Sequence, residues 1–400
     1  MNREKVIREC IRQGGTPFYL FDLDTFTERI QRIRECLGER ISLCYAMKAN
    51  PFLISSAVSQ VERLEVCSPG EFSICMDHKI PAEKLVVSGV YKEESATKNA
   101  LAYGGAKSIY TVESLGQLQL LEKEAEKGNS RIPVLLRLTS GNQFGMEEEV
   151  IREPIREREH FPHLEIRGLQ YYSGTQKKRR KVLEEELGRL DGLLKEWKEQ
   201  YSFEAKELEY GPGFYVPYFQ KEEEDELSET MRAFRELVEG LDFQGKITLE
   251  IGRYLAADCG IYVTRIVDAK ENAGQKYGIV DGGIHHLNYF GQTMAMKIPH
   301  FVQLDGESLE EKKEGKENPV TICGALCTVS DVLVKNLPLR GSYLGDVLVF
   351  ERTGAYSVTE GIYLFLSRNF PRIFSFSREQ GVTLVRDEIA SSQFNGGSQF

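Results

Sequence analysis

The sequence predicts an α/β protein, with a (β/α)8 TIM barrel and a second, mostly antiparallel β domain. Two observations support the barrel: short apolar runs alternate with charged helical segments between about residues 17 and 255, and the runs number eight, which is how many strands close such a barrel. A third observation supports the second domain. After about residue 255 the apolar runs are separated by glycine turns and not by long helices.

Each expected barrel strand is a short apolar run, and a helical pattern follows most of them. The expected strands are 41–47, 63–67, 85–88, 107–111, 133–138, 166–172, 206–210 and 247–251. The expected helices are 25–37, 53–61, 113–127, 181–200 and 225–240. Because strands alternate with helices, we expect the strands to be parallel. The charged stretch 177–200 is interpreted as an amphipathic outer helix and not as a catalytic cluster.

The region after residue 255 contains five apolar runs that we expect to be β-rich. They are 262–270, 276–283, 331–339, 346–352 and 362–367. We find no internal repeat in the sequence, and we expect the five runs to belong to one second domain.

Composition limits the function classes. Lys and Arg number 51 and Asp and Glu 61, so the net charge is −10, which argues against nucleic acid as a partner. No apolar run approaches the roughly 18 residues of a membrane span, and the N-terminus is charged where a signal peptide is apolar. The eight cysteines include no C-x-x-C pair, so we expect no metal site and a reducing, cytoplasmic location.

Three of the expected strands end in residues that could carry chemistry, as barrel enzymes require at this end. Lys48 follows a largely apolar strand, where burial can lower the pKa of its amine and favour a nucleophile. The alternative is a strand-end lysine that points into water. Gly211-Pro212-Gly213 is a turn whose backbone N–H groups could hold a phosphate. Glu250 precedes Gly252-Arg253 at the end of the last strand.

These motifs, with Cys327-Thr328-Val329-Ser330-Asp331 and Gly354-Ala355-Tyr356 after them, resemble in order the fold-type III pyridoxal-phosphate (PLP) decarboxylases. This is the family of diaminopimelate, ornithine and arginine decarboxylases, which is related to alanine racemase. The resemblance implies an alanine-racemase-like barrel over 24–255. It also implies that residues 1–23 join 256–400 in a β-sandwich or barrel-like domain.

The resemblance assigns three catalytic residues. Lys48 would form the Schiff base with PLP, and Glu250 would keep the pyridine nitrogen protonated. Cys327 would protonate the carbanion left by decarboxylation, and in this family the other subunit contributes it, which implies a homodimer with shared active sites. A carboxylate beside the pyridine strengthens the electron sink, whereas racemases place an arginine there. Glu250 therefore favours decarboxylation over racemisation.

The remaining positions carried over are cofactor contacts. The glycine turn, Arg253 and Tyr356 would hold the phosphate, and Ser68 and Glu71 match an element beside the cofactor. The full set is Lys48, Ser68, Glu71, Tyr172, Thr175, Gly211, Gly213, Glu250, Gly252, Arg253 and Tyr356.

Four positions depart from the family pattern. Tyr172 replaces the usual histidine that stacks on the PLP ring, Ile251 replaces a proline, and Pro212 removes one N–H donor from the phosphate turn. Thr328 stands where diaminopimelate and ornithine decarboxylases have a carboxylate for the distal ammonium of the substrate. Asp331 could compensate for that loss or could be structural, and we favour a structural role.

The segment from Gly252 through Val280 to His286, with 288–292 after it, resembles a subgroup that acts on acyl-chain or carrier-linked substrates, including carrier-bound glutamate. His285 and His286 either line the site entrance or are turn histidines. We expect a decarboxylase of an L-amino acid or amino-acyl conjugate, free or tethered to an acyl carrier protein. The alternatives are diaminopimelate decarboxylase, an amino-acid racemase and a non-enzymatic PLP-binding protein.

Overall fold

The computed structural model describes residues 3–224, 226–289 and 295–396. The chain divides into two compact units. The barrel unit comprises Arg29–Val216 and Asp225–Leu255, and the β unit comprises Met1–Glu28, Pro217–Glu224 and Ala256–Phe400.

Two short segments that we expected in the barrel domain therefore belong to the β unit. Residues 24–28 are held there by Arg378, which forms ion pairs with Asp24 and Glu28. Residues 217–224 are held by Arg352, whose guanidinium donates hydrogen bonds to the Pro217 carbonyl and the Glu224 carboxylate. Arg378 and Arg352 thus fix both ends of these short segments to the β unit.

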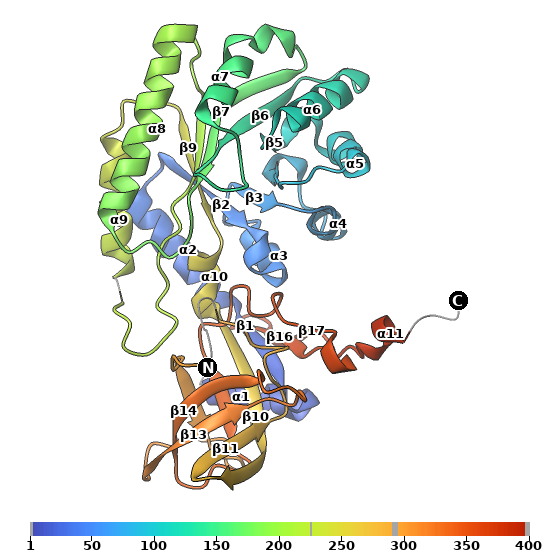
Figure 1. Cartoon of the computed structure of the whole chain (residues 1–400), viewed down its shortest axis with the longest axis vertical. Coiled ribbons are helices and arrows are strands. Elements are labelled where there is room, and N and C mark those ends of the chain that lie inside the picture. Colours follow the sequence, from blue (N-terminus) through green and yellow to red (C-terminus); the bar gives the residue numbers. More distant parts are fainter. Residues whose placement is uncertain (1–2, 225, 290–294, 397–400) are drawn as a thin grey trace. The chain divides into compact units, whose positions relative to one another are not determined.

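Eight parallel strands close the barrel, which confirms the predicted fold class (Figure 1). They are β2 (Ile41–Ala46), β3 (Arg63–Val66), β4 (Leu85–Val87), β5 (Ile109–Val112), β6 (Ile132–Leu138), β7 (Leu164–Tyr172), β8 (Glu207–Gly211) and β9 (Lys246–Ile251). The closure pairs β9 with β2, the last strand with the first.

Helices surround these strands (Figure 1). They are α2 (Leu23–Leu37), α3 (Ile54–Ala57), α4 (Pro69–Asp77), α5 (Glu94–Gly104), α6 (Leu115–Lys127), α7 (Glu148–Arg156), α8 (Arg180–Tyr201), α9 (Leu227–Glu239) and α10 (Arg253–Ala256). Helix α8 buries Leu183, Leu187, Leu190, Leu194 and Trp197 at helical spacing, so the charged stretch is an outer amphipathic helix as predicted. The expected helix 53–61 is reduced to α3.

The β unit is built on a nine-stranded, mostly antiparallel sheet, as predicted. Its strands are β1 (Phe18–Asp22), β10 (Gly260–Asn272), β11 (Gln275–Val280), β12 (Phe301–Leu304), β13 (Glu317–Cys323), β14 (Val332–Arg340), β15 (Val347–Phe350), β16 (Arg372–Ser377) and β17 (Gly381–Arg386). Within this sheet, the β1–β16 and β11–β13 pairs are parallel and the other pairs between described strands are antiparallel. Helices α1 (Arg3–Gly14) and α11 (Ser392–Asn395) complete the unit.

One β-rich expectation is wrong. The apolar run 362–367 forms turns and a short 3₁₀ segment, Phe365–Ser367, in which Leu366 has a positive φ of 57°. That backbone conformation cannot continue a strand, and Leu364, Phe365 and Leu366 are exposed. No helix in the described part of the chain is long and apolar enough to cross a membrane.

The barrel interior contains a buried ion pair. Arg63 on β3 forms two hydrogen bonds with Glu207 on β8, and Thr248 on β9 donates to the same carboxylate at 3.1 Å. Both charged side chains are at least nine-tenths buried. Each charge therefore depends on the other for compensation.

We expect Arg63→Ala to destabilise the barrel unit by about 3–5 kcal/mol, because it leaves the Glu207 carboxylate buried without its counter-charge. The measurement is urea unfolding followed by fluorescence of Trp197, the single tryptophan of the chain, which is buried in this unit. Lys195→Ala is the control, because Lys195 pairs with Asp242 on the exposed surface at 2.8 Å. Equal effects of the two substitutions would contradict the argument.

Candidate active site

Lys48 lies between two carboxylates at the C-terminal end of the barrel. It follows β2 in a 3₁₀ turn (Met47–Ala49), and its Nζ lies 2.6 Å from Glu65 Oε2 and 3.2 Å from Glu250 Oε1. The two carboxylates come from β3 and β9, the strands on either side of β2, where Ala46 pairs with Glu65 and Cys44 with Glu250. The barrel closure thus brings Lys48 and Glu250 together across 202 positions of the chain.

The pKa values of the two carboxylates shift in opposite directions, because Lys48 pairs more closely with Glu65 than with Glu250. Burial raises the pKa of Glu65, but the Lys48 ammonium outweighs burial and lowers the pKa to about 2. Burial and the neighbouring Glu65 charge raise the pKa of Glu250 to about 7, and Lys48 offsets only part of this. Glu65 is therefore the permanent counter-ion of Lys48, and Glu250 can gain or lose a proton near neutral pH.

The ends of β7 and β8 form the side of the site next to Glu250. Tyr172 pairs in register with Gly211, and a Cβ at Gly211 would lie 2.6 Å from Tyr172 Cδ2 and 3.0 Å from Glu250 Oε2. Gly213 has a positive φ of 60°, and a Cβ there would lie 2.0 Å from the Gly174 carbonyl oxygen. Only glycine allows these two loops to approach so closely.

Other predicted positions gather at the same end of the barrel. A Cβ at Gly252 would lie 2.8 Å from Ala49 Cβ, directly after Lys48. The pKa of Tyr172 is raised by burial and by Glu250, and charges on Lys48 and Arg253 oppose this rise, as does a hydrogen bond with Thr175. Tyr172, Thr175, Arg253 and the glycine turn thus surround Lys48 and Glu250.

Ser68 and Glu71 stabilise the turn that follows β3. Ser68 caps α4, since its Oγ accepts the Glu71 N–H at 3.1 Å, and Glu71 Oε2 accepts the Cys67 N–H at 2.6 Å. Cys67 Sγ in turn lies 3.8 Å from Lys48 Nζ. Ser68 and Glu71 therefore lie in the loop next to Lys48, and the side chains of both accept backbone N–H groups of that loop.

The remaining predicted residues, Cys327 and Tyr356, belong to the β unit. Cys327 is exposed in the loop before β14. Asp331 in that loop is 2% exposed and accepts the N–H groups of Ile284 at 2.8 Å and Leu326 at 2.7 Å. This supports the structural role that we favoured for Asp331.

His285 and His286 are buried in the β unit, which supports the interpretation as turn histidines. The His286 ring contacts the Asn369 carbonyl oxygen at 2.8 Å and the Tyr262 hydroxyl at 3.1 Å. Burial lowers the pKa of His286 to about 3, and burial with the Arg368 charge lowers that of His285 to about 4, so both are neutral near pH 7. Of the following segment, 290–292 lie outside the described residues.

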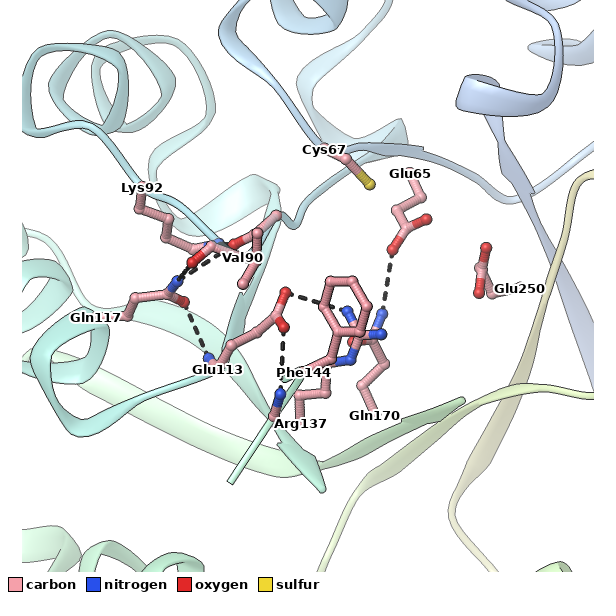
Figure 2. A network of polar contacts seen from close by, with 12 residues as sticks. Glu65, Cys67, Val90, Lys92, Glu113, Gln117, Arg137, Phe144, Gln170 and Glu250 are labelled. Atoms are coloured by element: carbon pink, nitrogen blue, oxygen red, sulfur yellow. Dashed lines mark hydrogen bonds and ion pairs between the residues drawn. The ribbon is translucent and has the colours of Figure 1, made fainter. Parts of the chain in front are cut away.

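Sequence reasoning missed a polar network that continues from Glu65 around the barrel (Figure 2). Gln170 donates to Glu65 at 3.3 Å and to Glu209 at 2.9 Å, while Arg137 donates to Glu113 at 3.1 Å. Lys92, beside Cys67 and Glu113, is half-buried, and the desolvation of its amine lowers its pKa to about 8. Their position relative to the strands could have identified most of them. The C-terminal halves of barrel strands, or the residues directly after them, contain Glu65, Glu113, Arg137 and Gln170.

We expect Glu250→Gln to change the pH dependence of stability in the ligand-free protein. The raised pKa of Glu250 means that the folded state binds more protons than the unfolded state between about pH 4.5 and about pH 7, so stability falls as pH rises through that window. The variant lacks this penalty. It should be more stable than the wild type above about pH 7, by on the order of 3 kcal/mol or less, and the difference should shrink toward about pH 4.5.

Urea unfolding at several pH values measures this difference. Glu239→Gln is the control, because Glu239 lies on the surface of α9. A stability difference between Glu250→Gln and wild type that does not vary with pH would refute the assignment.

Comparison with known proteins identifies the family. Residues 23–257 match the family model described as the pyridoxal binding domain of pyridoxal-dependent decarboxylases. An L-glutamyl-[BtrI acyl-carrier protein] decarboxylase of Niallia circulans is 28% identical, with 97% of this chain and 96% of the relative aligned. A diaminopimelate decarboxylase of Campylobacter jejuni is 26% identical, over 87% of this chain and 88% of the relative.

Solved structures show the same fold. A crystal structure of diaminopimelate decarboxylase from M. jannaschii superposes with a TM-score of 0.85 at 21% identity, covering 98% of this chain and 94% of that one. The family match confirms the resemblance, the PLP cofactor and the decarboxylase activity expected from the sequence. The chain belongs to the pyridoxal-dependent decarboxylases.

Proposed function

We propose that the site around Lys48 removes the α-carboxylate of an L-amino acid or amino-acyl conjugate whose side chain does not end in an ammonium group. The observation that carries this proposal is the placement of the Lys48 amine between Glu65 and Glu250 at the barrel end. The relative from Niallia circulans, which acts on a glutamyl carrier protein, supports a carrier-tethered substrate.

The residues at the site fit PLP. Lys48 supplies the amine that would hold the cofactor's aldehyde, and Gly211 leaves room between the Tyr172 ring and Glu250 where a larger residue would intrude. Gly213, Gly252 and Arg253 offer backbone N–H groups and a guanidinium for the phosphate. When bound, PLP supplies the electron sink that lets the bond between Cα and the carboxylate break.

The two carboxylates have different roles in the proposed site. Glu65 stays ionised and orients Lys48 through the 2.6 Å contact. Glu250, whose pKa is about 7, is suited to share a proton with a ring nitrogen that must stay protonated. Tyr172, on the strand next to the glycine turn, provides an aromatic face where the family usually has a histidine ring.

Cys327 is proposed to deliver a proton to Cα after carboxylate loss. Its exposure in the β unit supports this role, because a thiol must reach a site to act as an acid there. The resemblance places the thiol in the active site of a second subunit, so the proposal includes a homodimer in which each active site draws residues from both chains.

A second candidate is diaminopimelate decarboxylase, an activity that several relatives carry. Two features argue against it. Thr328 has no charge for a distal ammonium, and the Asp331 carboxylate is buried against backbone N–H groups. We therefore expect meso-diaminopimelate to be a poor substrate, and efficient release of lysine would establish the second candidate instead.

The proposed function is tested by measuring carbon dioxide release from L-glutamate, carrier-loaded glutamate and meso-diaminopimelate. We expect Lys48→Ala to abolish both turnover and the visible absorbance of the bound cofactor. Cys327→Ala should retain the absorbance but slow turnover by about 100-fold, since a positioned general acid typically contributes that much. Cofactor absorbance that survives in Lys48→Ala would rule out that assignment, and full turnover in Cys327→Ala would rule out the thiol.

Gly213→Ala should weaken PLP binding about tenfold or more. The new Cβ would overlap the Gly174 carbonyl and strain a positive-φ position, and 1.4 kcal/mol of strain corresponds to a factor of ten. The measurement is titration of the apoprotein with PLP. Gly188→Ala, on α8 with no atom within 4 Å of its added Cβ, should bind PLP as the wild type does. Unchanged affinity in Gly213→Ala would contradict this role of the turn.

A further inference from the structure

A surface hollow of about 1060 Å³ lies beside the loop that carries Cys327. It is lined by strands β10 and β11, by the loop from Cys323 to Asp331, and by the segment after the Phe365–Ser367 turn. Both Cys327 and Thr328 face it, so the hollow adjoins the thiol proposed as the proton donor.

The charged side chains that line this hollow are three cations and three carboxylates: Lys270, Lys335, Arg368, Asp268, Asp281 and Asp331. Two of the carboxylates are already bonded within the unit. Asp331 accepts two backbone N–H groups, and Asp281 accepts the Thr264 hydroxyl at 2.6 Å and the Arg265 N–H at 3.0 Å. Asp268 is exposed on β10 and accepts its neighbour's N–H. The six charges sum to zero, but the oxygens of Asp281 and Asp331 are engaged by donors within the unit, so the polar groups left for a ligand belong mostly to the cations.

Arg368 is hydrogen-bonded to the loop that carries Cys327. Its Nη2 donates to the Ala325 carbonyl oxygen at 2.9 Å, two residues before Cys327. Within the described residues this is the single hydrogen bond of the Arg368 side chain, although its guanidinium has five N–H groups. A guanidinium with remaining donors matches the planar, bidentate geometry of a carboxylate or phosphate.

We propose that Arg368 selects a substrate whose far end is anionic, and that it does so from the hollow beside Cys327. The inference deepens the proposed function and rests on it, because the hollow serves the substrate only if Cys327 reaches the reacting Cα. Thr328 leaves a distal ammonium without a counter-charge, and Arg368 supplies the opposite preference.

A free dicarboxylic amino acid and the phosphate of a carrier's pantetheine arm share this anionic chemistry. They are distinguished by assaying L-2-aminoadipate, the pantetheine amide of L-glutamate, and the same amide with its 4′-phosphate, with L-lysine as the cationic analogue. Preference for aminoadipate identifies a free acid, whereas preference for the phosphorylated amide over the unphosphorylated one identifies the carrier arm.

The variant is Arg368→Glu in the PLP-loaded enzyme, with Lys5→Glu on the exposed face of α1 as the control charge reversal in the same unit. For the preferred anionic substrate we expect Arg368→Glu to raise KM by roughly 10- to 100-fold, the range of a charge-assisted hydrogen bond, and to leave the cofactor absorbance unchanged. Lys5→Glu should match the wild type. A preference of the wild type for L-lysine, or an unchanged ratio of kcat/KM values in Arg368→Glu, would overturn the inference.

Calorimetric binding of glutarate and of 4′-phosphopantetheine provides a readout that needs no turnover. At least one should bind the wild type and lose affinity in Arg368→Glu, and binding of neither would also overturn the inference. If the proposed function itself were wrong, the result would be distinguishable from a failure of the Arg368 inference. No amino acid would then release carbon dioxide, or Lys48→Ala would keep its cofactor absorbance.

Discussion

The ion pair between Lys48 and Glu65 is the interaction on which the active-site chemistry depends. A carboxylate that is 2% exposed can stay charged only with a partner, and the ammonium at 2.6 Å provides it. Because Glu65 holds the charge, the nearby Glu250 experiences a like charge and a desolvated setting, which raise its pKa to about 7. One strong pairing thus produces two carboxylates of unlike behaviour within reach of one amine.

Barrel closure is the geometric condition for that arrangement. Lys48, Glu65 and Glu250 come from three adjacent strands, but β9 becomes a neighbour of β2 only when the eight-stranded sheet closes. The glycines of the turn after β8 fulfil a second condition, since their missing side chains let the ends of β7 and β8 approach Glu250. Substitutions at these glycines should therefore affect the site although they remove no charged group.

The sequence was most informative where periodicity and strand ends coincide. All eight barrel strands were predicted, because each is an apolar run that a helix or turn interrupts. Helices α4, α5 and α7 were missed. Helix α4 has a weak apolar stripe and begins at a capping signal, Ser68 with Pro69 and Glu71, that has little to do with hydrophobic spacing. The partnership of Lys48 with Glu65 was also missed, since strand register and not sequence order sets it.

Asp331 shows why specificity is harder to predict than chemistry. From its spacing after Cys327, this carboxylate could have bound a distal ammonium or held the loop. The sequence favoured the second role without deciding it, and the two backbone hydrogen bonds of Asp331 support it. Gly283 and Gly324 pack so tightly around it that a Cβ on either would lie within 2.8 Å of its oxygens. An acid enclosed in this way fixes the loop with its oxygens engaged by backbone donors, whereas Arg368, bonded to the same loop through Ala325, keeps donors for a ligand.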